Sequence, residues 1–132
     1  MKISASITNS FQNNEVTVST EGNSRNVVID PKPDGFGLAL NGGELLFLSL
    51  ATCFCNDLYR EAKKRNWEIS NVKVLVSGEF GGEGAPARNI FYEVFVEAPA
   101  RTPEEISSLI KKVDEVAEVH KTLRQGVEVT LR

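Results

Sequence analysis

A continuous apolar segment near the middle of the chain most constrains its fold. Residues 43–55 read Gly-Glu-Leu-Leu-Phe-Leu-Ser-Leu-Ala-Thr-Cys-Phe-Cys, and a more polar stretch follows as far as Arg65. We predict one helix over about residues 43–65, roughly 33 Å long at 1.5 Å per residue. Its first half is apolar nearly all round, which is typical of a buried helix. Because a small domain seldom encloses such a helix by itself, we expect the surplus apolar face to form a subunit interface.

Both cysteines of the chain, Cys53 and Cys55, fall in this helix. Positions two apart lie about 200° apart around a helix axis, so the two thiols point to opposite sides and cannot easily bridge each other. One histidine and two divergent cysteines do not make a usual zinc site, and we expect neither a metal nor another cofactor. Any catalysis therefore uses one thiol. A thiol in such a helix is either a small buried hydrophobe or, where neighbours stabilise its thiolate, a nucleophile.

The composition excludes several classes of function. A chain of 132 residues with 41% hydrophobic and 25% charged residues is typical of one soluble globular domain. A net charge of -3 and a pI of about 5.2 favour neither nucleic acid nor an anionic membrane as a partner. The N-terminus lacks the apolar core of a signal peptide, and no segment reaches the roughly 18 apolar residues of a membrane span. We expect a single cytoplasmic domain over residues 1–132.

Alternating apolar residues indicate strands on both sides of the central helix. Three short strands precede it, around residues 3–7, 16–18 and 27–29, and two longer ones follow, over residues 72–76 and 90–96. The segment Thr102-Pro103-Glu104-Glu105 opens a second helix with a capping box, Gly126 ends that helical stretch, and residues 127–131 indicate a terminal strand. The order β-β-β-α-β-β-α-β is that of an α+β fold.

This order, together with the segment Asn41-Gly-Gly-Glu-Leu-Leu-Phe-Leu-Ser-Leu-Ala-Thr-Cys-Phe, resembles the OsmC/Ohr family of osmotically inducible and organic hydroperoxide resistance proteins. In that family a long central helix starts with an Asn-Pro-Glu-Glu-Leu-like segment and carries a peroxidatic cysteine after an Ala-Ala-like pair. Cys53 matches that position. The segment Lys121-Thr-Leu-Arg-Gln-Gly-Val-Glu-Val is similar to the family's closing segment. The resemblance covers essentially the whole chain, and it implies an OsmC-like fold with a long buried central helix in an intertwined homodimer.

The resemblance also implies a mechanism and a set of catalytic residues. In the family, an arginine from the N-terminal sheet holds the reactive thiolate, and a glutamate near the start of the central helix orients that arginine. The matching candidates here are Cys53, Arg25 and Glu44. A hydroperoxide oxidises the thiolate to a sulfenic acid. This chemistry is sound because the thiolate is the attacking species and arginine does not lose its proton.

The sequence departs from the family's pattern in three places. The aligned closing segment puts Ala117 where the family has a second cysteine that forms a disulfide with the first. The aligned opening segment puts Gly43 at the orienting glutamate, with Glu44 one position later, and the residues around Arg25 match loosely. The two-cysteine cycle is therefore ruled out within one chain. A one-cysteine cycle, resolved by an external thiol, is compatible with the sequence.

Three functions stay open at this point. The first is a thiol peroxidase that reduces organic hydroperoxides through Cys53 with an external thiol reductant, in oxidative-stress defence. The alternative is a non-catalytic family member that binds a small apolar ligand at the dimer interface. The third is a purely structural stress protein, which would show neither a thiolate nor a ligand. On the helix, Asp57 would raise the pKa of Cys53 and Arg60 would lower it. A thiolate therefore needs Arg25 or a charge from the partner chain.

The other candidate residues also have structural explanations. Glu44 suits the positive end of the helix dipole, and it lies about 13 Å from Cys53 along a straight helix, so it reaches the sulfur only through an arginine. Arg25 is otherwise explained as a solvated strand end. His120, the one histidine, lies near the apolar stripe of the second helix, and we expect a structural residue with satisfied hydrogen bonds.

Overall fold

An antiparallel sheet of three strands opens the chain, in the order β1 (Ile3–Ser10), β2 (Asn13–Thr20) and β3 (Asn23–Asn26). The computed structural model describes residues 1–132, and the sheet belongs to the first of two units, Met1–Leu45 and Leu46–Arg132. Val16 is the buried apolar residue of the sheet, whereas Ile3 and Ile7 are exposed. That residues 1–132 act as one domain stays a prediction.

The third strand lies earlier in the sequence than the apolar residues 27–29 predict. β3 consists of four polar residues, and the prediction for residues 27–29 is wrong. The turn at Glu21 and Gly22, both at positive φ, starts β3 directly after it, because the turn of a short hairpin sets the register of its strands. Val27 still donates its backbone N–H to the carbonyl of Val16 at 2.9 Å, and the chain then leaves the ladder.

The long central helix is confirmed as α1 (Gly42–Lys64). Asn41 caps it, because its side-chain oxygen accepts the backbone N–H of Glu44 at 2.9 Å. The Glu44 carboxylate in turn accepts the backbone N–H of Asn41 at 2.8 Å. This reciprocal pair is a capping box, which satisfies two N–H groups and determines where the helix begins.

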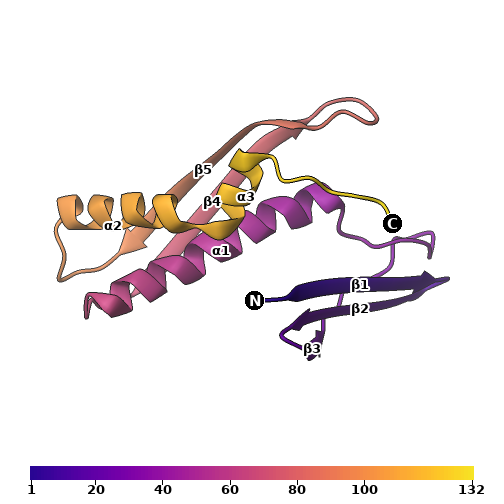
Figure 1. The fold of residues 1–132 in the computed structure, drawn as a ribbon, viewed down its shortest axis with the longest axis horizontal. Coiled ribbons are helices and arrows are strands. Elements are labelled where there is room, and N and C mark those ends of the chain that lie inside the picture. The colour runs from indigo at the N-terminus through magenta and orange to yellow at the C-terminus, as the bar shows by residue number, and fades with distance from the viewer. The chain divides into compact units, whose positions relative to one another are not determined.

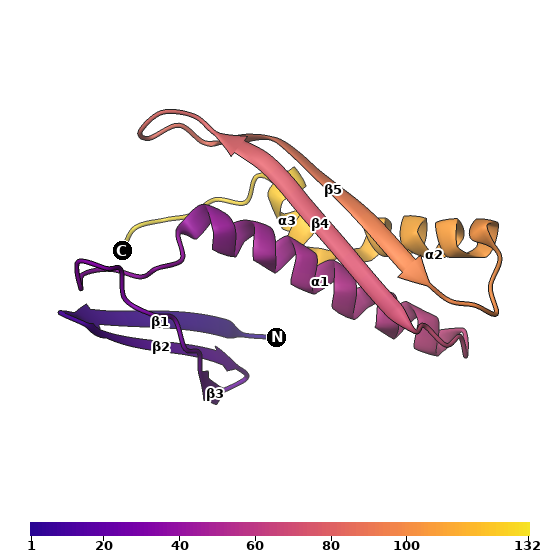
Figure 2. The same cartoon turned by 180° about the vertical axis from the view of Figure 1, so that it is seen from behind.

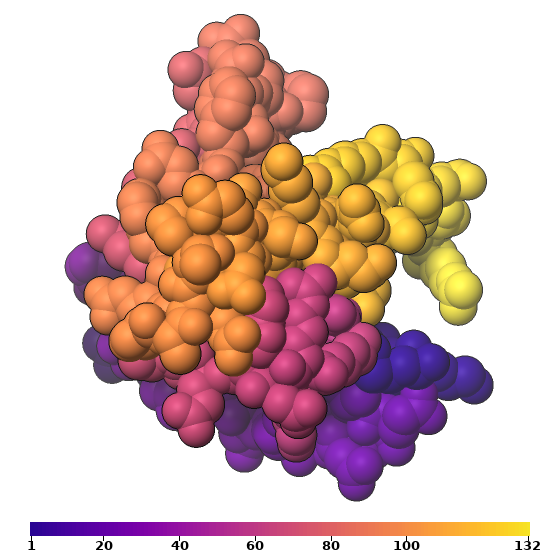
Figure 3. All heavy atoms as spheres, turned by 90° about the vertical axis from the view of Figure 1, so that its left-hand side faces the viewer, coloured from indigo at the N-terminus to yellow at the C-terminus, as the bar shows by residue number.

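The second unit packs helices against one face of a long hairpin. The hairpin consists of β4 (Asn71–Phe80) and β5 (Ala87–Glu97), and the predicted connection between them is confirmed. The two remaining helices are α2 (Pro103–Val116) and α3 (Glu118–Gln125). Figures 1 and 2 show β4 and β5 along one side of α1 and α2 running beside α1. In Figure 3 the atoms of α2, in orange, lie directly against those of α1, in magenta.

The core lies between α1, α2 and the hairpin, and it consists of residues that α1 and α2 contribute at helical spacing, together with Ala117 directly after α2. Its fully buried members are Phe54, Leu58, Ala62, Leu109, Val113 and Ala117. The inward-facing residues of β4 and β5 pack on them. As predicted, a capping box opens α2: Thr102 accepts the N–H of Glu105, and the Glu105 carboxylate accepts the N–H of Thr102. None of the three helices combines the length and the hydropathy that a membrane span requires.

The second helical stretch is broken at Ala117, where one continuous helix was predicted. This residue has φ −62° and ψ 109°, ends α2 and precedes α3. Its N–H donates to Val113 and its carbonyl accepts the N–H of Lys121, at 2.9 and 3.0 Å. Alanine is the strongest helix former, so local propensity does not predict the break. Gly126 does end α3, at a φ of 61°.

The predicted terminal strand does not form in the single chain. Residues 127–132 have no regular structure, and Val129 and Leu131 are 96% and 98% exposed. A strand needs a neighbouring edge for its backbone hydrogen bonds, and no strand of this chain pairs with the segment. The α+β class is confirmed, with one strand fewer than predicted.

Candidate active site

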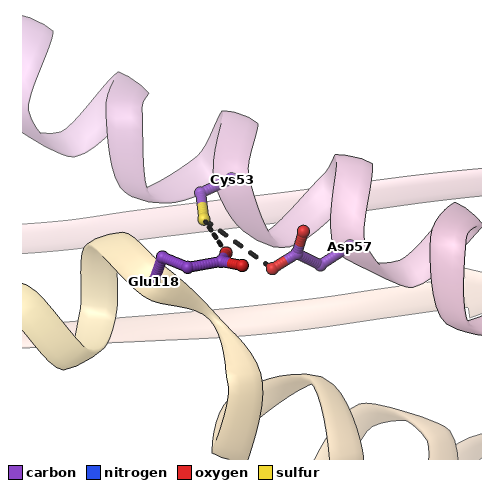
Figure 4. Close-up of side chains that lie close together, drawn as sticks. All are labelled: Cys53, Asp57 and Glu118. Carbon is purple, nitrogen blue, oxygen red and sulfur yellow. Dashed lines mark hydrogen bonds between the residues drawn. The ribbon is translucent and has the colours of Figure 1, made fainter. Parts of the chain in front are cut away.

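Cys53 lies on α1 opposite the first turn of α3 and is half-buried. Its sulfur is 3.8 Å from a carboxylate oxygen of Asp57, one turn further along α1. It is also 3.8 Å from a carboxylate oxygen of Glu118, which lies 65 residues away in the sequence. The thiol can donate its proton to either carboxylate, and Figure 4 shows the three side chains pointing toward one another. We call Cys53, Asp57 and Glu118 the thiol cluster.

The break at Ala117 makes this arrangement possible. The first N–H groups of any helix lack partners within it. In α3 the backbone N–H groups of Glu118 and Val119 lie at the Cys53 sulfur and lower its pKa. A continuous helix would have bonded them to carbonyls of the preceding turn instead. Sequence reasoning missed Glu118 for the same reason, since no signal in the sequence announces the break.

Taken together, the surroundings raise the pKa of Cys53. Burial is the largest cause, and the negative charges of Asp57 and Glu118 add to it. These effects outweigh the two backbone N–H groups. Within one chain the sulfur therefore favours the protonated thiol, the less nucleophilic form. The predicted effect of Asp57 is confirmed.

Arg60 supplies the one cation bound to the thiol cluster. Its Nη1 lies 3.1 Å from Asp57 and 3.6 Å from Glu118. Even so, burial raises the pKa of Asp57, and the charge of Glu118 adds to that. The pKa of Glu118 is lowered, mainly by a backbone N–H at the start of α3. Arg60 thus acts on the carboxylates, whereas the sequence predicted an action on the sulfur.

The thiol cluster also has the spacing of a cation site. One ligand atom from each of its three residues lies within 4.8 Å of the other two. The sequence reasoning counted only histidine and cysteine as ligands and did not consider this set. Arg60 neutralises part of the carboxylate charge of this set.

The other two predicted catalytic residues belong to the N-terminal unit. Arg25 lies on β3, opposite Val18 of β2, with an exposed side chain. Glu44 is engaged in the capping box of α1 through one carboxylate oxygen. The structure brings Cys53 together with Asp57, Glu118 and Arg60, and the roles of Arg25 and Glu44 stay predictions.

His120 departs from its prediction in one respect. It is buried as expected, with 4% of its surface exposed, but neither ring nitrogen has a hydrogen-bond partner. Buried polar atoms are rarely left unpaired. The prediction of satisfied hydrogen bonds is therefore wrong.

Comparison with known proteins identifies the family. Residues 35–132 match the model of the OsmC-like protein family, and no curated protein gives a significant match. Among solved structures, an OsmC-like protein from Mycoplasma pneumoniae is 22% identical, with a TM-score of 0.64 over 96% of this chain and 87% of its own.

Two further structures are organic hydroperoxide resistance proteins. The one from Legionella pneumophila is 21% identical, with a TM-score of 0.60 over 99% of this chain and 95% of its own. The one from Elizabethkingia anophelis is 23% identical, with a TM-score of 0.60 over 98% of this chain and 92% of its own. At these identities the likeness establishes the fold. Since the family model spans well over half of the sequence, the chain belongs to the OsmC-like protein family.

Proposed function

We propose that this protein reduces organic hydroperoxides with the Cys53 thiol, drawing electrons from an external thiol, in oxidative-stress defence. The observation that carries the proposal is the setting of the sulfur. It is half-buried and packs on the hydrophobic core, but it also lies among two carboxylates and the first N–H groups of α3, polar neighbours that a purely packing residue would lack. Family membership and the likeness to two hydroperoxide resistance proteins support it.

The proposed cycle uses one cysteine. The sulfur attacks a peroxide oxygen, so that an S–O bond forms and the O–O bond breaks. Cys53 becomes a sulfenic acid, and the leaving alkoxide takes up the thiol proton, relayed by a carboxylate of the thiol cluster, to leave as an alcohol. An external thiol then condenses with the sulfenic acid and releases water. A second external thiol frees Cys53 and leaves as a disulfide.

The first step needs a cation at the sulfur, because the pKa of Cys53 is raised within the second unit. We assign this role to Arg25, from the same chain or from a second copy, with Glu44 as its orienting residue. The capping box occupies Oε2 of Glu44, and Oε1 is free for a guanidinium. Arg25→Met should slow Cys53 alkylation at pH 7, and Arg25→Lys should restore part of the rate.

A matched variant tests the role of Glu44. Glutamine also forms a capping box, so Glu44→Gln keeps the start of α1 and removes only the charge. The expected result is slower alkylation of Cys53 with unchanged thermal stability. Unchanged alkylation in both Arg25→Met and Glu44→Gln would overturn the assignment of these two residues.

We propose a homodimer as the functional form. The face of the hairpin turned away from the core carries Leu75, Phe91 and Phe95, exposed by 48%, 66% and 53%. Large apolar side chains exposed together on one face of a hairpin favour a protein partner. Residues 127–131 also lack a strand to pair with, and a second copy would supply one. Analytical ultracentrifugation should give twice the mass of the chain, and a monomer at micromolar concentration would contradict the proposal.

Peroxide turnover tests the function directly. The purified protein should consume cumene hydroperoxide in the presence of dithiothreitol, and Cys53→Ser should abolish this. Cys55→Ser, two residues along the same helix, is the matched control and should retain turnover. Dimedone should label Cys53 after peroxide addition, because it traps sulfenic acids. Equal turnover in Cys53→Ser and the wild type would end the proposal.

The raised pKa of Cys53 favours a second candidate, a non-catalytic OsmC-like protein that binds a small apolar molecule between two copies of the chain. The pH dependence of alkylation separates the two functions. A thiol that reacts with a pKa near or above about 8.5 supports binding, and one well below 7 supports the peroxidase.

A further inference from the structure

A cavity of about 210 Å³ lies between α1, β5 and α3, and none of the thiol-cluster residues lines it. Its walls are mainly apolar, and its lining residues are Leu50, Ile90, Tyr92, His120, Leu123 and Arg124. An engineered apolar cavity of about 150 Å³ holds one benzene molecule of six carbons. By proportion, this cavity holds a molecule of about eight non-hydrogen atoms.

His120 brings an unpartnered polar group to this cavity. Its ring packs edge-on against Phe54 and Tyr92, with centroids 5.4 and 4.7 Å apart. Burial lowers the pKa of His120, and the charge of Arg124 adds to that, so the imidazole is neutral at pH 7. A neutral imidazole offers one N–H donor and one bare nitrogen acceptor. Neither is used by the protein.

The charge at the cavity is already balanced. Arg124 donates from Nη2 to the Asp114 carboxylate at 2.7 Å and from Nη1 to the Asp114 carbonyl at 3.3 Å. The Tyr92 hydroxyl donates to the same carboxylate. We call Tyr92, Asp114 and Arg124 the Asp114 cluster. Two of the five guanidinium N–H groups are thus engaged, and Nε is free to donate to a ligand.

We propose that this cavity binds a small neutral alcohol or phenol, with its apolar body against Leu50, Ile90 and Leu123 and its one hydroxyl between His120 and Arg124. A hydroxyl matches both groups, because it can donate to the bare imidazole nitrogen and accept from the guanidinium. A carboxylate ligand would place a second negative charge beside Asp114, and the positive charge of Arg124 already neutralises Asp114. A purely apolar molecule would leave His120 unpaired, which costs free energy in a buried site.

Titration with para-cresol, toluene and para-toluate tests the proposal, since these probes differ only in the polar group. His120 is the single histidine, so its imidazole NMR signals are unambiguous. We expect para-cresol to shift the imidazole ¹⁵N signals and to bind at least tenfold more tightly than either other probe. Equal affinity for toluene, tighter binding of para-toluate, or an unperturbed imidazole would each overturn the proposal.

Variants locate the binding in this cavity. His120→Phe keeps the aromatic packing and removes both nitrogens, so para-cresol should bind about tenfold more weakly while toluene changes little. Lys121→Gln, the exposed neighbour on α3, is the matched control and should bind like the wild type. Cys53→Ser should also bind normally, because the inference does not depend on the proposed peroxidase. If His120→Phe does not fold, the wild-type imidazole shifts decide. Retained para-cresol affinity in a folded His120→Phe would overturn the proposal.

Discussion

The two ends of α3 meet two clusters of ionisable side chains that differ in their charge balance. At its first turn lies the thiol cluster, in which two carboxylates and a thiol have Arg60 as their single neighbouring cation. At its last turn lies the Asp114 cluster, in which one carboxylate accepts hydrogen bonds from both a phenol and a guanidinium. The pKa values respond in opposite directions: that of Asp57 is raised and that of Asp114 is lowered.

This difference separates a cluster whose charges are balanced within the chain from one whose charges are not. Asp114 has more partners than its charge requires, so its cluster is complete within the chain. The pKa of Tyr92 is raised to about 12, by burial first and by its bond to Asp114 second, and the phenol therefore keeps its proton at any physiological pH. The thiol cluster is incomplete, because Cys53 has acceptors around it and no cation at the sulfur. An incomplete cluster on a half-exposed thiol is where a substrate or a partner group would act.

Removing the buried ring that packs on Tyr92 of the Asp114 cluster should have the largest effect. Phe54 is fully buried and contacts Tyr92 and His120, and it follows Cys53 directly in the sequence. Phe54→Ala should lower the free energy of unfolding by about 3–5 kcal/mol, measured by urea denaturation at one protein concentration. Thr52→Ala, on the exposed side of α1, should stay within about 0.5 kcal/mol of the wild type. A loss below about 1 kcal/mol in Phe54→Ala would show that this core tolerates its removal.

Neutralising the two aspartates should change stability with opposite dependence on pH. The pKa of Asp114 is lowered in the folded protein, so its contribution is present above the unfolded value and is lost as the pH falls through the folded value. Asp114→Asn should therefore cost on the order of 1 kcal/mol at pH 7 and less near pH 3, discounted because this side chain is 41% exposed.

The folded pKa of Asp57 is raised, so the sign reverses. The native state holds this proton more tightly than the unfolded chain, and the wild type loses stability as the pH rises from the unfolded value through the folded one. Asp57→Asn lacks that loss, and its stability relative to the wild type should rise from pH 4 to pH 7 by on the order of 1 kcal/mol. Urea denaturation at pH 3, 4 and 7 measures how the stability of each variant, relative to the wild type, changes with pH. If the relative stability of both variants changed with pH in the same direction, the distinction between the two clusters would be lost.

A smaller effect is expected from the exposed carboxylate of the thiol cluster. Glu118→Gln removes a negative charge 3.8 Å from the Cys53 sulfur. In a largely solvated setting this is worth at most about 1 kcal/mol, so iodoacetamide should alkylate Cys53 about two- to fivefold faster at pH 7. The Cys55→Ser background leaves one thiol to follow, and Glu68→Gln is the control. The gain should shrink at high salt, and an unchanged rate at low salt would show that Glu118 does not act on the sulfur.

Local patterns predicted the elements that short-range physics determines. The apolar run and Glu44 predicted α1 to within one residue at each end, and Thr102 with Glu105 predicted the start of α2. These features depend on contacts a few residues apart, and the sequence displays them directly. For the candidate site, the same reasoning identified Cys53 and the effect of Asp57, which lies one helical turn away.

The features that were missed depend on contacts between distant segments. The polar strand β3 follows its turn, the break at Ala117 has no local signal, and residues 127–131 need an edge that one chain does not offer. Glu118 could not be identified as a neighbour of Cys53 because that proximity exists only once α3 is placed. The same holds for the unpaired nitrogens of His120.

By itself, the sequence indicated that this protein has one candidate nucleophile on a long central helix in an α+β fold that resembles the OsmC/Ohr family. Apolar periodicity and capping motifs indicate the helix and the fold class, because they depend on residues a few positions apart, and the resemblance of residues 41–54 indicates the family. Only the tertiary structure decided the electrostatic setting of Cys53 and the chemistry of the cavity beside His120. Charge interactions and desolvation depend on distances across the fold, and a pKa is therefore set by side chains that the sequence keeps far apart.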